Sequence, residues 1–475
     1  MRRLITFLLL LLLPSLGWAT LYKKGPMTIE ASIENQSAIK PDFSRYIKVM
    51  NIFDVRAQFK PNDHVSFFAH IHKYQDLAYN IEDRYSDARH RMISNRAVFD
   101  GDSWVRELYL DIFTDLVDFR IGKQIITWGS ADGMRVLDAY INPLNWRELT
   151  LRPWNEMKIP LWMLKAEIAP TLNGSLQFLF IPDFEPEEYA RPGSPYAFRM
   201  TEKERNAYMS LENLGYRVDV NVHEPGQNIK NAKYGLRWRD IVGNMEYTLN
   251  ILYGWDTLST VNSSFFDTST ASIPPKFPPY RPGMPPLGST YRVNKRYKRI
   301  WVFGGSFSKT FVSSALKGLT LRGEFAYVPN KVVTYLDDHS RSHQTRADKY
   351  SYVIGLDKYL FTNWLFSFQF IQTILSPGDK NGHSFILPSG GIQHKVTNYY
   401  TLKVSTDFFH ERLKPNVLIL YGDRNEWRIS PRFPFEWNDH IITTLGAHIL
   451  EGRSSTYFGE FKHEKQLYFE FKYSF

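Results

Sequence analysis

The chain has 475 residues, a formal net charge of +9, 16% aromatic residues and a mean hydropathy of −0.35. It contains no cysteine, which excludes disulfides, thiolate metal sites and the lipid-modified cysteine of a lipoprotein. After the first 19 residues, no stretch approaches the roughly 18 consecutive apolar residues that a membrane helix needs, so helical membrane architecture is excluded as well.

Residues 1–19 are predicted to be a secretory signal peptide. Arg2 and Arg3 precede an apolar run at 4–13, and a Gly-Trp-Ala exit at 17–19 suits signal peptidase. The run is too short to span a bilayer as a helix, so we expect cleavage near Thr20 and a single domain over residues 20–475. Loss of the two arginines lowers the charge from +9 to +7. Because the chain is exported, anionic lipid or an anionic solute is a more natural partner for this charge than nucleic acid.

Apolar and polar residues alternate strictly in several segments: 65–72, 107–112, 117–125, 319–327 and 364–370. A period of two indicates a strand with one apolar face. Each segment has about the length that crosses a bilayer when the strand is tilted. The high aromatic content is natural for a membrane barrel, in which aromatic side chains form interfacial girdles.

The connections between these segments are alternately short and long. Short turns are predicted at 61–63, 115–118, 172–174, 240–244, 310–318, 361–363, 408–413 and 436–439. Long polar connections are predicted near 76–103, 129–158, 184–231, 257–296, 330–347 and 376–393. This asymmetry is typical of short periplasmic turns and long extracellular loops. We therefore predict an all-β fold, a transmembrane antiparallel β-barrel of about 18 strands, with 16 as the alternative.

Two segments are assigned to external loops. Residues 214–223 also alternate, but a barrel strand there would break the order of short and long connections. Residues 274–286 are rich in proline, which lacks the amide donor of a strand ladder.

The last eleven residues, 465–475, form the clearest strand. Leu467, Phe469, Phe471, Tyr473 and Phe475 alternate with polar or amphipathic residues. A chain that ends on Phe within this alternation resembles the C-terminal strand that the barrel-insertion machinery recognises. We expect Phe471, Tyr473 and Phe475 to be this insertion signal.

A dense group of polar residues marks a candidate constriction. Strand parity places Glu107, Asp111, Arg120 and Gln124 in the lumen, where opposite charges on neighbouring strands can pair. Glycines at 122, 129 and 133 suggest a loop that folds inward over its own strand. The further pore-lining candidates are Trp128, Asp132, Arg135, Asp138, Asn142, Arg237, Arg239, Arg322 and Glu324.

Two interpretations of this group stay open. In one, the charged side chains form a constriction that selects the solutes that pass, as charged rings do in pores. In the other, they form a salt-bridged lumen wall that fixes strand register and loop docking without any solute preference.

The same region resembles a group of proteobacterial outer-membrane barrels that is functionally unassigned and porin-like. Its signature is an L-R-E-x-Y-L-D strand, an R-x-G-K-Q-x-x-x-W-G strand end and a D-G-x-R-x-x-D-x-x-N-P loop, matched here by residues 105–111, 120–129 and 132–143. Val105 replaces the usual leucine, and residues 144–146 also differ from the usual continuation. The resemblance implies a barrel in the outer membrane of a Gram-negative bacterium, and a solute only by analogy.

We expect a channel for small polar or anionic solutes, with no enzymatic activity and no cofactor. No metal site is expected, because His70 and His72 share a lumenal face but no third ligand is apparent. The expected partners are outer-membrane lipids and lipopolysaccharide, the insertion machinery and small solutes. The alternative is a barrel that exports lipid or polysaccharide with periplasmic partners, which lumenal aromatics such as Tyr74, Tyr109 and Trp128 would favour.

Overall fold

The computed structural model describes residues 22–85, 104–129, 131–270, 285–313, 315–336, 342–376, 385–386 and 392–475. The predicted signal peptide and most of the proline-rich loop lie outside the described residues.

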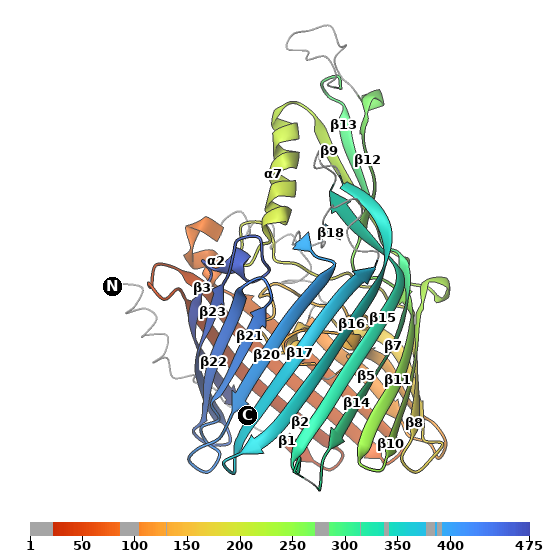
Figure 1. Ribbon diagram of the computed structural model, residues 1–475, viewed down its shortest axis with the longest axis vertical. Coiled ribbons are helices and arrows are strands. Elements are labelled where there is room, and N and C mark those ends of the chain that lie inside the picture. The colour runs from red at the N-terminus through yellow and green to blue at the C-terminus, as the bar shows by residue number, and fades with distance from the viewer. Residues whose placement is uncertain are drawn as a thin grey trace.

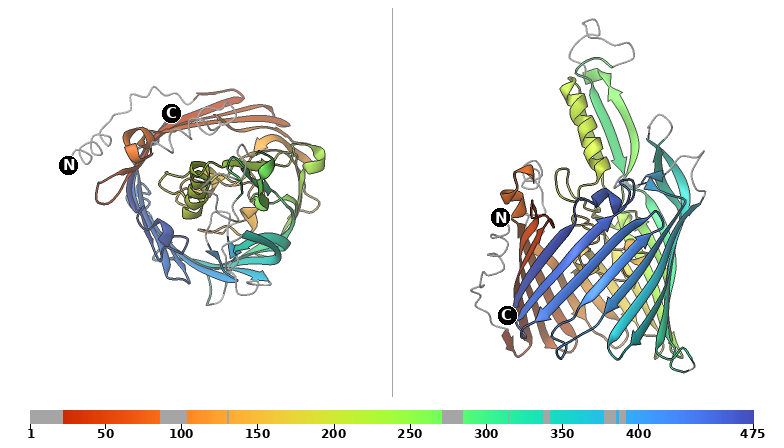
Figure 2. Two further views of the ribbon diagram at one scale, coloured as in Figure 1. Left: turned by 90° about the horizontal axis from the view of Figure 1, so that it is seen from above. Right: turned by 60° about the vertical axis from the view of Figure 1, so that its left-hand side comes forward.

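One antiparallel sheet closes on itself to form a barrel (Figures 1 and 2). It contains 21 described strands, of which β1 (Tyr22–Lys24), β18 (Phe385–Ile386) and β19 (Ile392–Gln393) are short and do not span the wall. The other 18 form the wall, which closes where β24 pairs with β2 from Ser32↔Ser474 to Ile39↔Leu467. The predicted all-β barrel of about 18 strands is confirmed.

The strands of the wall vary in length, and the longest belong to its middle part. In chain order they are β2 (Met27–Ile39), β3 (Tyr46–Asn62), β4 (Val65–Asp76), β5 (Val105–Ile112), β6 (Asp118–Gln124), β7 (Leu161–Ile168), β8 (Ser175–Ile181), β10 (Lys233–Val242), β11 (Met245–Trp255), β14 (Arg299–Thr310), β15 (Leu319–Leu336), β16 (Ser342–Leu360), β17 (Trp364–Ser376), β20 (Val396–Ser405), β21 (Asn416–Gly422), β22 (Glu426–Glu436), β23 (Ile441–Glu451) and β24 (Gln466–Ser474).

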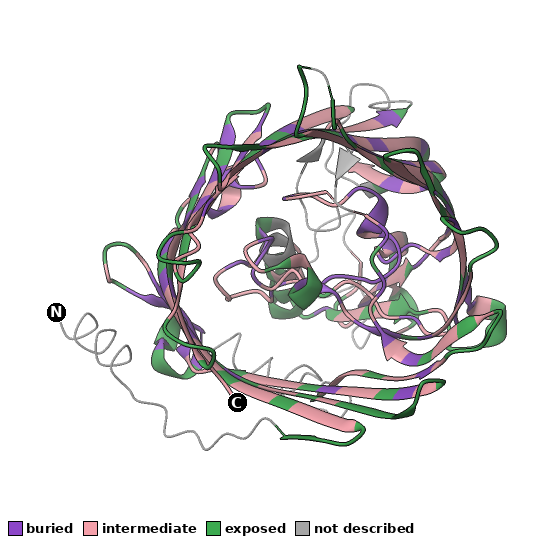
Figure 3. Cartoon of the chain, turned by 90° about the horizontal axis from the view of Figure 1, so that it is seen from below, coloured by how far each residue is buried: buried purple, intermediate pink, exposed green. Residues whose placement is uncertain are grey.

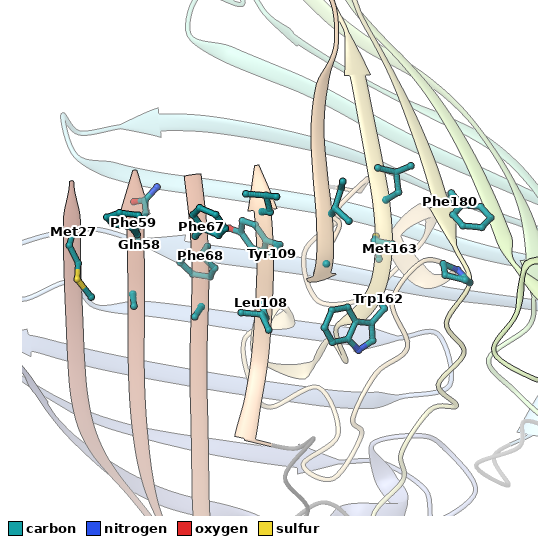
Figure 4. A pocket seen from close by; sticks show the side chains of 17 residues that line it. Met27, Gln58, Phe59, Phe67, Phe68, Leu108, Tyr109, Trp162, Met163 and Phe180 are labelled. Carbon is teal, nitrogen blue, oxygen red and sulfur yellow. The ribbon is translucent and has the colours of Figure 1, made fainter. Parts of the chain in front are cut away.

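The outer face of the wall is apolar, as the period-two pattern requires. Leu108, Ile121 and Trp162 point outward and are 44%, 47% and 49% exposed, whereas the inward Asp111 and Gln124 are buried. A hollow of about 660 Å³ lies in this surface. Figure 4 shows side chains that line it, among them residues of β3, β4, β5 and β7. In a membrane this surface contacts the lipid chains.

All the predicted short turns lie at one end of the barrel, which is the end where the chain terminates in Figure 1. Phe361, Phe409 and Trp437 occupy three of these turns and are 80%, 67% and 57% exposed. Exposed aromatic rings at one level are typical of the membrane–water interface, where an amphipathic ring is favoured. We therefore take this end as the periplasmic end.

A small subdomain lies on the opposite, external end of the barrel (Figures 1 and 2). It consists of the helix α7 (Arg199–Asn213) and a sheet of β9 (Arg217–His223), β12 (Thr260–Asp267) and β13 (Thr290–Arg296), with β9 and β13 parallel. The Nζ atom of Lys295 lies 2.8 Å from Glu204 Oε1, which ties the sheet to α7. The alternating segment 214–223 is thus outside the barrel, as predicted, but it is a strand, and α7 was not predicted.

The prediction of a long connection at 330–347 is wrong. Strands β15 and β16 continue through most of it and pair up to Leu336↔Ser342, with a bulge between Val328 and Lys331. The polar residues that suggested a loop lie on a hairpin that rises beyond the barrel rim (Figure 1). There the strands have no lipid-facing side and need no continuous apolar face, although Val333 and Ala347 are buried in a small cluster with Leu375.

Several segments fold into the barrel and fill part of its interior (Figure 3). Their apolar residues, such as Val136, Leu137, Ile141 and Leu149, are buried in one cluster together with inward-facing residues of the wall. The other described helices are short: α2 (Ala78–Ile81), α6 (Trp154–Met157) and the 3₁₀ turns η1 (Asp83–Tyr85), η2 (Leu137–Ala139), η3 (Ile229–Asn231), η4 (Thr268–Thr270) and η5 (Gly459–Phe461). No helix among the described residues is long and apolar enough to cross a membrane.

Candidate functional site

The connection between β6 and β7, residues 125–160, enters the lumen, and we call it the inward segment. Its two ends are tied together by Asn142, which is fully buried. Asn142 Oδ1 accepts a hydrogen bond from Ile126 N at 2.9 Å, and its Nδ2 donates to Ile159 O at 2.9 Å and to Gln124 O at 3.4 Å. One predicted site residue therefore closes the base of the loop.

The inward segment crosses the lumen to β15 and β17. The Asp132 carboxylate pairs with Arg322 Nη2 at 2.5 Å, and its backbone amide donates to Gln369 Oε1 at 2.9 Å. Glu324 accepts the backbone amide of Leu137 at 2.5 Å. At Gly129 a Cβ atom would lie 2.6 Å from Glu324 Oε1, so only glycine permits this approach to the wall. Asp132, Arg322 and Glu324, far apart in sequence, thus meet as one docking contact.

A second docking contact joins the inward segment to β3, and sequence reasoning missed it. The carboxylate of Glu148 lies 2.7 Å from Lys48 Nζ, 3.1 Å from Arg147 Nη2 and 3.5 Å from Arg152 Nε, and all four side chains are about 90% buried. Burial alone would raise the pKa of Glu148, but the three cations outweigh it and hold the pKa well below its usual range. The only sequence feature that could have indicated this contact is the group of charged residues at 147–152, and such a group is equally typical of a solvated surface.

The same segment is also held by contacts within itself and by contacts to β8 and β22. Asp138 pairs with Lys158 at 2.6 Å and accepts the backbone amide of Trp128 at 3.1 Å. The indole of Trp128 is 3% exposed and donates to Gln177 Oε1 at 2.8 Å. From β22, Arg428 Nη1 donates to Thr150 Oγ1 at 2.8 Å. Trp128 and Asp138 are therefore framework residues of the fold inside the barrel.

Other predicted residues belong to the wall and make local contacts. Arg120 Nε and Nη2 lie 2.6 and 3.1 Å from the two oxygens of Asp111, and the guanidinium lies over the ring of Tyr109 at 4.0 Å. Glu107 accepts the amide of Ile125 at 3.2 Å. Gln124 is fully buried and donates to Met163 O at 3.1 Å.

The structure places the two arginines of β10, Arg237 and Arg239, in different surroundings. Arg237 Nη1 donates to Thr127 O at 3.4 Å and so touches the inward segment. Arg239 pairs with Glu246 at 2.8 Å, nearer the periplasmic end, and both side chains are about half exposed. Arg239 therefore does not join the cluster at the constriction.

The two lumenal histidines have a third neighbour that the sequence did not reveal. Asp54 on β3 lies 2.6 Å from His70 Nε2 and 2.6 Å from His72 Nδ1. These are the residue types of a metal site, and their ligand atoms lie within 4.8 Å of one another. Arg56 Nε, 3.5 Å from the same carboxylate, supplies a competing positive charge.

The space left around the inward segment consists of three cavities. The upper cavity, about 260 Å³, lies on the external side of the segment, and the lower cavity, about 480 Å³, lies between the segment and β20–β24. Trp154 lines both. The rim cavity, also about 480 Å³, lies beside the periplasmic turns and shares Lys403, Asn416 and Arg432 with the lower one. The three therefore follow one another from the external side to the periplasmic side.

The fold and this interior define the class: a porin-type β-barrel of the outer membrane, in which an inward loop divides the lumen. Residues 23–474 match the model of the family described as protein of unknown function (DUF1302), and the chain belongs to this family. No curated protein matches the sequence. The expectation of a functionally unassigned family with a porin-like fold is confirmed, and the motif signature itself stays a prediction.

Solved structures of outer-membrane proteins share the fold at very low sequence identity. The structure of Pseudomonas aeruginosa OpdK with vanillate is 8% identical, with a TM-score of 0.50 over 94% of this chain and 98% of that one. OccK11 (OpdR) of the same organism is 7% identical, with a TM-score of 0.49 over 94% and 95%. Salmonella typhi OmpF, in complex with daunomycin, is 8% identical, with a TM-score of 0.42 over 94% and 97%.

Proposed function

We propose that the protein is a passive channel through which small anionic solutes cross the outer membrane, and that it is not an enzyme. The observation that carries this proposal is the series of cavities from the external side to the periplasmic rim. An 18-stranded barrel has room for an aqueous path, and these cavities remain beside the inward segment, which fills part of the lumen. The predicted export by a signal peptide agrees with this role.

The charge along the path supports a preference for anions. The lower cavity is lined by six lysines and arginines and by four carboxylates. Arg432 pairs with Glu470 at 3.1 Å, but Lys403 and Lys472 make no ion pair within the described parts of the chain. Unpaired lysines in a narrow, partly shielded lumen raise the local concentration of anions, and salt weakens the effect.

Planar-bilayer conductance of the purified protein tests the proposal. In a KCl gradient we expect ohmic steps and a reversal potential displaced toward chloride. The double variant K403Q/R432Q removes both charges shared by the lower and rim cavities, so its reversal potential should move toward zero. The matched control K309Q/K317Q removes two lysines at or near a periplasmic turn that line none of the three cavities. It should behave as the unmodified protein, and a bilayer that stays silent would contradict the proposal.

The second candidate is the export or transfer of lipid or polysaccharide with periplasmic partners. The aromatic lining of the upper cavity favours it. The lower cavity argues against a lipid path, because an acyl chain there would meet ten charged side chains. Loss of an envelope lipid or polysaccharide in a deletion strain, together with a normal small-solute permeability, would support this candidate instead.

A further inference from the structure

The upper cavity is enclosed by aromatic side chains from separate parts of the chain. Tyr140 and Trp146 come from the inward segment, Tyr189 from the connection between β8 and β10, Tyr399 from β20 and Tyr457 from the connection between β23 and β24. Aromatic rings offer a large apolar contact area at low conformational cost, together with polar edges. The cavity thus has apolar walls at a point where the path is otherwise charged.

Three polar groups on the same walls are buried and have no hydrogen-bond partner among the residues that the structure describes. They are the Nε and Nη1 atoms of Arg135, the hydroxyl of Tyr140 and the hydroxyl of Tyr457. The remaining guanidinium nitrogen of Arg135, Nη2, donates to Asn142 O at 3.1 Å. Buried donors are costly when unpaired, and most buried polar groups in proteins have a partner. Three such groups around one cavity point to a molecule that binds there and accepts hydrogen bonds.

The charges of the cavity favour an anion. Its carboxylates already have partners: Asp256 pairs with Lys331, Glu187 accepts from the Trp146 indole at 2.5 Å, and Glu426 accepts from the amide of Phe458 at 2.7 Å. Burial also raises the pKa of Glu187, which favours its neutral form.

By contrast, three basic side chains that line the cavity form no ion pair within the described residues. They are Arg135, Lys349 and Arg424. Asp138, Glu187 and Glu324 act on Arg135 from beyond ion-pair distance. A ligand that brings its own negative charge into the cavity would make the closer contact.

We propose that the upper cavity is a binding site for a small organic anion that combines a carboxylate with a compact, flat apolar body. The carboxylate lies against Arg135 and the hydroxyls of Tyr140 and Tyr457, and the apolar body lies against the rings of Trp146 and Tyr189. A volume of about 260 Å³ holds roughly nine water molecules at ~30 Å³ each, which fits a single-ring acid and excludes a long acyl chain or a polysaccharide. This inference deepens the proposed function, because it names the kind of solute that the channel accepts from outside.

Binding to the purified full-length protein in detergent tests the site, with benzoate as the probe. Benzoate titrated by calorimetry should bind, whereas benzamide, which has the ring without the charge, and acetate, which has the charge without the ring, should bind at least about tenfold more weakly. The variant R135M should weaken benzoate binding on the order of ten- to a hundredfold, and Y457F should weaken it severalfold. R239M removes a lumenal guanidinium that lies nearer the periplasmic end and does not line this cavity, and this variant should bind benzoate as the unmodified protein does.

Each outcome decides between the site and its alternatives. Equal affinity for benzoate and benzamide, unchanged binding by a folded R135M, or no benzoate binding at all would overturn the proposal. Y457F keeps it testable if R135M does not fold, since that change removes only one hydroxyl. If the protein binds benzoate but shows no conductance in bilayers, the channel function is wrong and the binding site stands. If it conducts but does not bind benzoate, the binding site is wrong and the channel function stands.

Discussion

Replacing Glu148 by Gln should release the inward segment from β3. The substitution keeps the shape of the side chain and removes the one carboxylate shared by Lys48, Arg147 and Arg152. At an effective dielectric constant of about 20, contacts of 2.7, 3.1 and 3.5 Å are each worth roughly 5–6 kcal/mol before desolvation. Breaking a buried ion pair from one side costs ~3–5 kcal/mol net, because the partner charges stay buried. The docked state should lose about this amount.

Hydrogen exchange of the purified protein measures the change directly. A loss of ~3–5 kcal/mol corresponds to an increase in local opening of roughly two to three and a half orders of magnitude. The effect should be concentrated in residues 144–158, whose amides include Leu149 N, bonded to Trp146 O at 2.9 Å, and Leu151 N, bonded to Glu148 O at 3.1 Å.

Two further variants make the experiment decisive. K48Q/E148Q leaves fewer unpaired cations than E148Q and should recover part of the protection. E246Q breaks a half-exposed pair with Arg239 at the periplasmic end and should leave the segment unchanged. Exchange in E148Q within tenfold of the unmodified protein would refute the reasoning.

Three more outcomes are expected. Burial, together with nearby carboxylates such as Asp183 and Glu188, raises the pKa of Glu185 to about 7 from 4.5. Because the folded state then binds the proton more tightly than the unfolded state, the connection between β8 and β10 should lose stability as the pH rises from about 4.5 to about 7. Exchange corrected for intrinsic rates should show this, and E185Q should abolish it. R120E should place a carboxylate beside that of Asp111 and lower the thermal stability. The swap D111R/R120D should restore the stability. If R120E is instead as stable as the unmodified protein and has an altered ion selectivity, the interpretation as a selective constriction is favoured. G129A should push a methyl group against Glu324 and increase single-channel conductance by loosening the docked segment, whereas unchanged conductance would mean that the wall yields.

The barrel could be predicted from the sequence because each spanning strand has lipid on its outer side and a polar interior on its inner side, which imposes a period of two on its residues. That periodicity located the short turns, the terminal strand and the inward face of Glu107, Asp111, Arg120 and Gln124. It failed at 330–347, where the hairpin rises beyond the barrel rim and has no lipid-facing side, and at α7, whose partner sheet is formed by segments distant in the chain.

The interior was less predictable for a related reason. The contacts between Asp132 and Arg322 and between Glu148 and Lys48 join residues 190 and 100 positions apart. Their pairing depends on the path of the inward segment across the lumen, and no local pattern encodes that path. The glycines at 129 and 133 indicated that a loop turns inward, but they did not indicate which wall it reaches.

The reach of the inward segment also constrains the order of assembly. It belongs to about the first third of the chain, yet the strands that hold it on the far side, β15, β17 and β22, all belong to the second half and are synthesised after it. It can take its final position only after those strands have joined the sheet. The contacts that fix the segment to the far wall are therefore made late in folding, and the interior of the barrel takes its final form after most of the wall has been synthesised.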